Sequence, residues 1–485
     1  MTATTTPATA PEAAPSATRA DASARSSRTG AALAFAVAAL AAAFGTALST
    51  LMEHAALALY GERMVAESET ARLLLALSGT LLIGVSVVVA AIVVRQACTS
   101  AVEDLRGEIA LRRLLGAAAR SERRRMLGRC TAVGVGGAVL GWGVGVLAAI
   151  PIEHLLTQPE EGLELTGMPP VMPAALVPAV AVALAAAIAA WVATRTVLAV
   201  TPLEALRGAG VDVETAGPRG RRVGTRVSLA LGALLLVAAV LLGAITPFAV
   251  LVGFAGGVVL VIGIVGIAPL AAPPLVALAG RAMGRSVPAR VAAGTLATHP
   301  GRTASLVLAL FVGTAIVVMM VTAGASLTTA VTTIERDPVF RAELTALFSG
   351  VTAVITAIVA FSAVLGVLGF VASMLLSVRR RTPEIGLLRM LGLRRAQTLR
   401  MLLAEAGAIT LVAVTTGFGI GVLLGWIGVQ STVGSVLGVV STAPTIPWQL
   451  PVALLIAGLA VAVAASWPAG RRAARIAPLA AVAAD

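Results

Sequence analysis

The chain is a series of long apolar runs separated by short polar segments. A helix needs about 20 predominantly apolar residues to cross the hydrocarbon core of a membrane. Ten runs reach roughly that length, so we expect about ten transmembrane helices. They lie at residues 30–59, 73–99, 124–152, 172–198, 227–246, 248–280, 303–329, 345–377, 396–430 and 447–470.

Composition supports this interpretation. Of the 485 residues, 58% are hydrophobic and only 12% are charged, and the mean hydropathy is +0.97. A soluble protein could not cover so much apolar surface with so few charges. The sequence therefore predicts an all-α, multi-pass integral protein of the cell membrane. Residues 1–29, rich in Ala, Thr, Ser and Pro, predict a disordered tail. The run at 30–59 is too long for a signal peptide, so we expect it to be a retained span.

Charge predicts the orientation. With the N-terminus in the cytoplasm, only four arginines fall outside, together with eleven acidic residues; the arginines are Arg63, Arg72, Arg336 and Arg341. Because cytoplasmic loops carry an excess of Lys and Arg, we expect both termini to be cytoplasmic. The net charge of +13 then indicates contact with anionic lipid rather than nucleic acid.

Several kinds of site are excluded by residue type. All 36 basic residues are arginine, so the chain lacks the lysine with which a P-loop holds ATP. His54, His154 and His299 show no metal-ligand spacing, and no catalytic motif is present, so we expect neither a metal site nor an enzyme. Cys98 and Cys130 are both expected in the reducing cytoplasm, where a structural disulfide is disfavoured.

The sequence repeats itself at a constant offset of 276 residues. The segment EIALRRLLG from Glu108 recurs as EIGLLRMLG from Glu384, and the same offset relates Trp191 to Trp467. One offset that matches Glu, Arg, Trp and Pro from residue 108 to residue 203 indicates a duplication. We expect two four-helix repeats and a linker with two further helices, with boundaries at 30–207, 208–301 and 302–485.

The four spans of the first repeat and the two spans of the linker precede the second repeat. Because this number is even, the second repeat starts on the same side of the membrane as the first and crosses it in the same sense. They are parallel repeats, related by an axis along the membrane normal. Whatever the first repeat presents to the cytoplasm, the second presents again, which predicts two equal cytoplasmic partners.

The segment between the second and third spans of each repeat predicts a short amphipathic helix on the inner membrane surface. In the second repeat, Thr382 is the expected N-cap, Pro383 the first helical residue, and Glu384 lies at the positive end of the helix dipole. Gly392 is expected to end the helix. The expected apolar face is formed by Ile385, Leu388 and Leu391, with Arg389 on the other side.

The first repeat keeps Glu108, Arg113 and Gly116 but has Arg106-Gly107 where the second has Thr382-Pro383. We therefore expect its helix to be less firmly capped. The alternative for both segments is an interfacial helix that only anchors on anionic lipid.

The segment RRRTPEIGLLRMLGLRRAQTLRMLLAEAGAITLVAVTTGFGIGVLLG resembles the FtsX-like permease domain of ABC transporters. HPGRTASLVLAL, from His299, is similar to the entry into the first span of such domains. The resemblance implies that each short helix is a coupling helix docking on a separate ATPase subunit, in two copies, which binds the ATP. The contact residues it implies are Glu108, Arg112, Arg113, Gly116, Glu384, Ile385, Arg389 and Gly392.

Many members of that family carry a large extracytoplasmic domain, whereas the outer loops expected here are only about 60–72 and 330–344. Export or extraction of an amphiphile fits short loops better than delivery from a binding protein. Two alternatives stay open. One is an ATP-independent secondary transporter, which would need intramembrane carboxylates; the other is a non-transporting, mechanotransmitting or signalling partner.

Three smaller sets of residues complete the expectations. Spaced glycines inside spans predict close helix packing. Arg129 and Glu405 stand at equivalent positions with opposite charge, so they either pair between the repeats or reach the cytoplasm separately. Glu53 and His54 either bind substrate or mark the outer membrane interface. The packing glycines are Gly141, Gly145, Gly417 and Gly421.

Overall fold

The structure is a computed structural model. It describes residues 105–156, 176–199, 219–282, 300–334, 382–437 and 443–475 continuously, with scattered helical residues within 32–50, 80–102, 292–296 and 367–378.

Every regular element in the described residues is a helix. The elements are α4 (Arg106–Leu114), α5 (Ala119–Leu156), α6 (Leu176–Ala193), the 3₁₀ helix η2 (Thr194–Ala199), α8 (Arg219–Gly243), α9 (Ala249–Ala282), α11 (Pro300–Ile334), α13 (Thr382–Met390), α14 (Arg395–Leu437) and α15 (Gln449–Arg475).

Among the described residues, six helices are long and apolar enough to cross a membrane: α5, α6, α8, α9, α11 and α14. They coincide with six of the ten predicted spans, which confirms a multi-pass, all-helical protein. The apolar part of α15, Gln449–Ala464, is shorter. The predicted spans at 30–59, 73–99 and 345–377 fall largely outside the described residues, so the ten-helix arrangement stays a prediction.

The predicted spans at 227–246 and 248–280 meet at Thr246-Pro247, and a turn there separates α8 from α9. The amides of Ile245 and Thr246 both donate to the carbonyl of Leu242, at 2.9 Å each, and end α8. The amide of Ala249 donates to the carbonyl of Thr246 at 3.2 Å and starts α9. The two spans therefore form a tight antiparallel hairpin.

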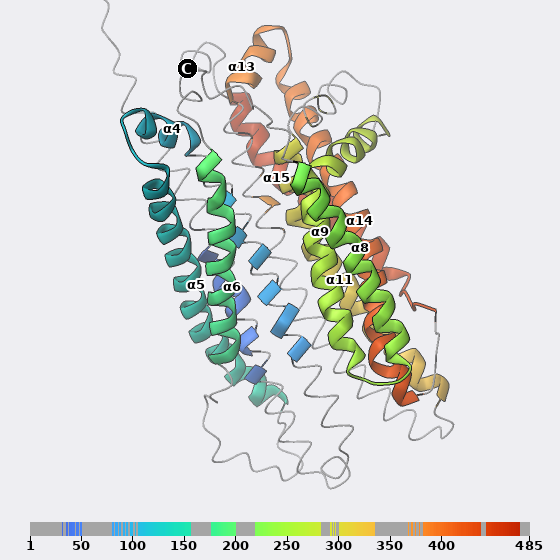
Figure 1. The fold of residues 1–485 in the computed structure, drawn as a ribbon. Helices are drawn as coiled ribbons and strands as arrows, with labels where there is room; N and C mark the ends of the chain where they lie inside the picture. The colour runs from blue at the N-terminus through green and yellow to red at the C-terminus, as the bar shows by residue number, and fades with distance from the viewer. Residues whose placement is uncertain are drawn as a thin grey trace, which may run out of the picture.

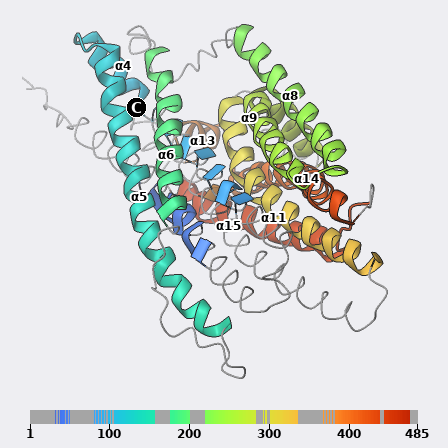
Figure 2. The ribbon, with the colours of Figure 1, turned by 60° about the horizontal axis from the view of Figure 1, so that its bottom comes forward.

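The long helices form two groups (Figure 1). One contains α5, α6 and η2, which pack on one another; the other contains α8, α9, α11, α14 and α15, with α14 at its centre. Turning the molecule leaves the two groups distinct, with the described residues of 80–102 between them (Figure 2). Helices α4 and α13 lie at the same end of the molecule (Figure 1).

Each group has its own apolar core. The first surrounds Val94, Cys98, Met126, Cys130 and Ala190. The second is larger and includes residues of α9, α11, α13, α14 and α15. The two meet through the second span of the first repeat: Ile92 packs against the second core, and a Cβ added at Gly84 would lie 2.6 Å from the ring of Phe254.

Glycines let α5 and α14 approach the first span of their own repeat. A Cβ at Gly141 would lie 1.9 Å from the backbone oxygen of Ala39, and one at Gly145 would lie 2.5 Å from that of Ala43. On α14, Gly417 and Gly421 approach the carbonyls of α11 in the same manner, at 3.0 and 2.6 Å. Contact of this closeness between helix backbones needs residues without side chains.

Candidate functional site

Helices α4 and α13 are the same structure built twice. Each has nine residues, and their bounds differ by 276 positions at both ends. Each ends at a glycine with positive φ, 98° at Gly116 and 102° at Gly392. Both glycine amides donate to the carbonyl three residues earlier, and the next amide donates to the carbonyl five residues earlier, at 3.0–3.1 Å. This pattern is a Schellman motif, and it turns the chain directly into α5 or α14.

The starts of the two helices differ. The residue before α4 is Leu105, which makes no side-chain capping hydrogen bond, as expected from the Arg106-Gly107 sequence. Helix α13 includes Thr382 as its first residue, one position later in the helix than the predicted N-cap. The side chain of Glu384 lies outside the described residues.

One face of each short helix is buried in the core of its own repeat. Ile109 in α4 and Ile385 in α13 occupy equivalent positions, and both are buried. Leu388 is packed against the same core as Ile385. Leu391, which we expected on this face, is instead exposed, because the helix ends before it and the Schellman turn carries it outward.

The opposite edge of each helix is apolar and exposed, and this edge was missed in the sequence. Leu111 is 55% exposed and its equivalent Leu387 is 53% exposed; Leu115 is 82% exposed and Leu391 is 77% exposed. Leu114 on α4 is also exposed. We call these two sets, with Met390, the outer edges of α4 and α13. The apolar residues of each outer edge are three or four residues apart, and this spacing in the sequence could have indicated a second apolar edge.

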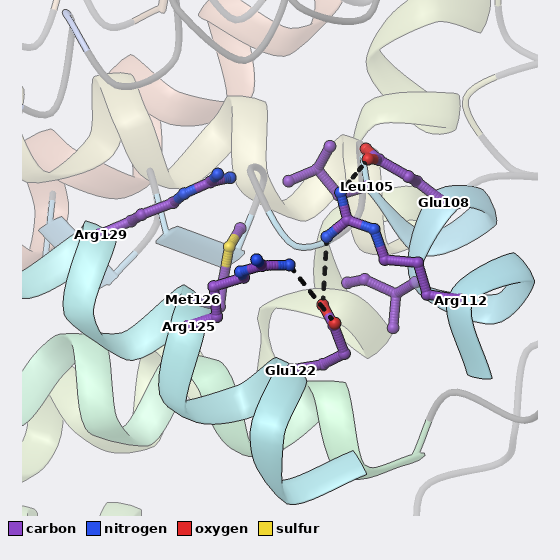
Figure 3. A pocket seen from close by; sticks show the side chains of 8 residues that line it. Leu105, Glu108, Arg112, Glu122, Arg125, Met126 and Arg129 are labelled. Atoms are coloured by element: carbon purple, nitrogen blue, oxygen red, sulfur yellow. Dashed lines mark hydrogen bonds and ion pairs between the residues drawn. The ribbon is translucent and has the colours of Figure 1, made fainter. Parts of the chain in front are cut away.

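A pocket between α4 and α5 holds an ionic network (Figure 3). The guanidinium of Arg112 lies 2.5 Å from the carboxylate of Glu108 on the same helix and 3.4 Å from that of Glu122 on α5. Arg125 reaches the other oxygen of Glu122 at 3.9 Å. Glu122 is buried, whereas Arg125 is exposed. The network therefore fixes α4 to the first turns of the long helix behind it.

The second repeat keeps Glu108 of this network as Glu384 but has no charge at the other three equivalent positions. Arg112 corresponds to Leu388, Glu122 to Thr398 and Arg125 to Met401. Thr398 and Met401 are buried, so α13 is held to α14 by apolar packing where α4 is held to α5 by ion pairs.

Arginines also gather on Trp191 at the end of α6. The guanidinium of Arg195 lies 3.9 Å from the centre of the indole ring, and that of Arg123 lies 5.6 Å away. Arg123 also donates to the backbone oxygen of Trp191 at 3.3 Å. These cation–π contacts join α5, α6 and η2 near the base of α4.

The remaining predicted residues are distributed as follows. Arg113 and Arg389 are both half-buried on their helices. Arg129 is exposed and lines the pocket between α4 and α5, whereas Glu405 is fully buried in α14. Pairing of these two charges stays a prediction. Glu53 and His54 lie outside the described residues.

The structure brings the two cysteines together, which the sequence did not predict. Cys98 and Cys130 are both buried and free, belong to the same apolar cluster, and their thiols are close enough to interact. Within the described residues, no three His, Cys, Asp or Glu side chains are placed to hold a metal ion.

Comparison with known proteins matches these features to one family. The model of the family described as FtsX-like permease C-terminal matches residues 80–199 and again 356–478. The two matches cover about half of the chain and begin 276 positions apart, which is the repeat offset. Each contains one short helix and the long helix that follows it.

A curated relative is the macrolide export ATP-binding/permease protein MacB of Vibrio parahaemolyticus serotype O3:K6 (strain RIMD 2210633). It is 31% identical over 153 residues, which is 32% of this chain and 22% of MacB. The matched part is thus about a fifth of the length of that relative. No solved structure matches the chain significantly. On the double family match, the chain belongs to the FtsX-like permease family.

Proposed function

We propose that this chain is the membrane permease subunit of an ABC transporter, with α4 and α13 as its two contacts for a separate ATPase subunit. Family membership and similarity to a protein named as an ATP-binding/permease protein support this function. In this proposal the end that carries α4 and α13 is cytoplasmic, as are both termini, and the membrane is the cell membrane.

The duplicated outer edges are the observation that carries the proposal. Apolar surface exposed to water is unfavourable by roughly 25 cal/mol per Å². Exposed leucines beside the turns at Gly116 and Gly392 therefore indicate a surface that a partner covers. Equivalent leucines have nearly equal exposure, for example Leu115 at 82% and Leu391 at 77%. Two equal edges fit two copies of one partner.

Inside the chain, each short helix can pass a displacement to a long helix. Ile109 and Ile385 anchor the two helices in their repeat cores. The glycine turns at Gly116 and Gly392 leave only a few residues before α5 and α14 begin. A partner that moves the outer edges would therefore move the ends of two membrane spans.

The partner must supply the ATP site in this proposal. A P-loop holds the β- and γ-phosphates with a lysine, and these 485 residues contain none, since all basic residues are arginine. We accordingly assign ATP binding and hydrolysis to the ATPase subunit and none to this chain.

Export or extraction of an amphiphile is the transport reaction that we propose. The name of the relative describes macrolide export, and a macrolide is an amphiphile. The spans also expose large apolar side chains along their length, among them Leu147, Leu184 and Leu241. Such surfaces contact lipid tails, from which an amphiphilic substrate can enter laterally.

Glu405 is the observation that favours the alternative, an ATP-independent secondary transporter. It is fully buried within the candidate span Arg395–Thr432, and buried intramembrane carboxylates can relay protons. It lies ten residues into α14, however, which is about 15 Å from the helix start at 1.5 Å per residue. That position is well short of the middle of a helix of 43 residues.

Reconstitution tests the function. In proteoliposomes the purified chain alone should show no ATP hydrolysis, and co-expression with the ATPase should give hydrolysis together with ATP-dependent transport of an amphiphilic dye. Transport that persists without the ATPase and follows an imposed proton gradient would favour the secondary transporter instead.

Substitutions on the outer edges test the contact. Leu115→Ser and Leu391→Ser should each weaken capture of the ATPase about tenfold, which corresponds to losing one buried leucine side chain. Ala118→Ser is the matched control, since Ala118 is exposed just beyond the turn and off the outer edge. Equal capture by all three variants would mean that the edges only contact lipid.

A further inference from the structure

Cys98 and Cys130 stand on either side of α4 in the sequence and touch each other in space. Cys98 lies near the end of the second span, before α4, and Cys130 lies about three turns into α5, after it. They are 3% and 8% exposed, lie in one buried cluster, and their thiols are close enough to interact. All of α4, the Gly116 turn and the start of α5 lie between them in the chain.

Packing alone does not require this pair of thiols. The equivalent positions in the second repeat hold Met374 and Ala406, which are both fully buried in the larger core together with Ile385. The same place in the fold is thus filled satisfactorily by apolar side chains. Both cysteines of the chain lie in the first repeat and in one buried cluster.

We infer that Cys98 and Cys130 form a reversible disulfide site, which closes residues 98–130 into a loop around α4. The co-reactant that we assign is a low-molecular-weight disulfide. This proposal does not depend on the chain being a permease, because it concerns only the two thiols and the helix between them.

The exchange balances without any further reagent. One cysteine thiolate attacks a sulfur of the small disulfide, so that its S–S bond breaks and a mixed disulfide forms. The second cysteine thiolate then attacks the protein sulfur of the mixed disulfide and releases the second small thiol. The two cysteine protons end on the two small thiols, the small disulfide is reduced, and the cysteines are oxidised.

The ionic network controls access to the thiols. Leu105, Ile109 and Met126 line the pocket between α4 and α5, and all three pack in the same cluster as the two cysteines. An oxidant reaches the thiols when these side chains separate, and the ion pair between Arg112 and Glu122 spans the opening (Figure 3).

Mass and thiol counting test the site directly. The full-length chain in detergent is incubated with glutathione disulfide, then denatured and alkylated with N-ethylmaleimide. We expect an intact mass lower by about 2 Da, the two hydrogens removed, no alkylated cysteine, and full reversal by dithiothreitol. Because the chain contains only two cysteines, an intrachain disulfide must join this pair.

Two variants copy the second repeat and should fold, since their replacement side chains already pack at equivalent positions. Cys98→Met and Cys130→Ala should each give no intrachain disulfide, only an unchanged mass or one glutathione adduct.

Glu122→Gln should accelerate oxidation about fivefold by opening the pocket, while Glu108→Gln, on the exposed side of the network, should change the rate less than twofold.

The effect of the disulfide on α4 can be measured by amide hydrogen exchange. In the oxidised chain, amide hydrogen exchange across residues 106–114 should slow at least threefold, because the helix can no longer separate from α5. Persistence of both thiols in the folded chain under conditions that oxidise the denatured chain would overturn the proposal. Disulfide-linked dimers in place of the intrachain product would overturn it as well.

Discussion

The guanidinium of Arg112 on α4 lies 3.4 Å from the carboxylate of Glu122 on α5, and this ion pair joins a short helix to a membrane span. The two positions are Leu388 and Thr398 in the second repeat, where packing replaces charge. One duplicated scaffold thus holds its two short helices by different forces. Only the attachment of α4 should depend on charge and salt.

Removing the charge of Glu122 should loosen α4. Glu122→Gln leaves Arg112 with Glu108 as its ion-pair partner among the described residues, and we expect a loss of about 1 kcal/mol because both arginines stay partly in water. That is roughly a fivefold increase in the population of the open state. Hydrogen exchange of the amides in 106–114 measures the population of this open state.

Glu108→Gln is the matched control in the same network. Glu108 is about half exposed, so its helical ion pair with Arg112 should contribute only about 0.3–0.5 kcal/mol. If Glu108→Gln reduced the hydrogen-exchange protection more than Glu122→Gln, the ion pair within α4 would stabilise the helix more than the ion pair between α4 and α5.

Alanine should not be tolerated at the turns after the short helices. Gly116 and Gly392 have φ of 98° and 102°, where an L side chain is strained by roughly 1–2 kcal/mol. Gly116→Ala and Gly392→Ala should each lower the thermal midpoint of the solubilised protein and weaken stimulation of the ATPase. Gly128→Ala is the control, because Gly128 is helical and a Cβ there would meet nothing within 4 Å.

Neighbouring glycines on α5 should respond in opposite ways. A Cβ at Gly141 would lie 1.9 Å from the carbonyl oxygen of Ala39, whereas one at Gly143 would meet nothing within 4 Å. Gly141→Ala should cost about 1–3 kcal/mol by forcing the helices apart. Gly143→Ala should be neutral or stabilise the helix by up to about 1 kcal/mol.

Thermal unfolding of the two variants side by side measures the difference. Gly421→Ala and Gly419→Ala repeat the comparison on α14, where the first Cβ would lie 2.6 Å from the carbonyl oxygen of Ala315 and the second would meet nothing within 4 Å. Similar midpoints for Gly141→Ala and Gly143→Ala would mean that α5 does not pack as closely as described.

Much of the local structure could be predicted from the sequence. The positions of α4 and α13 follow from the 276-residue offset, and their ends follow from Gly116 and Gly392, because a glycine after an apolar helix indicates a left-handed turn. The α8–α9 hairpin follows from Thr246-Pro247. These features depend on residues close together in the chain, where spacing alone fixes the geometry.

The contacts across elements could not be predicted in the same way. A helix of nine residues is apolar on two sides, so periodicity did not reveal that Ile385 would be buried while Leu391 would be exposed. Glu122 lies in the first turn of α5, where it suits the helix dipole; its pairing with Arg112 depends on how the turn folds α4 back.

The contact between Cys98 and Cys130 likewise depends on the packing of two spans 32 positions apart in the chain. Their spacing fits no known ligand pattern, so no sequence pattern places them together. Only the three-dimensional arrangement of the first repeat reveals the pair.

The burial of Glu405 decides how its predicted pairing with Arg129 is tested. Since Glu405 is fully buried, Glu405→Arg should impair folding on its own, and the informative pair is Glu405→Gln with Arg129→Gln. If the two charges interact during transport, the double variant should lose no more activity than the worse single variant. Additive losses in ATP-dependent transport would show that the residues act independently.

Exchanging the chemistry of the two repeats tests the attachment of α4 most directly. Arg112→Leu alone leaves the buried Glu122 with Arg125 at 3.9 Å, and Glu122→Thr alone leaves Arg112 with Glu108, so each should loosen α4. The double variant Arg112→Leu/Glu122→Thr carries the residues that already hold α13 to α14. It should recover most of the hydrogen-exchange protection of 106–114, and that protection should become insensitive to salt between 0.05 and 0.5 M, roughly the range over which screening shortens the Debye length from above to below 10 Å. A double variant that is looser than either single variant would mean that the two repeats do not share one packing scheme at this junction.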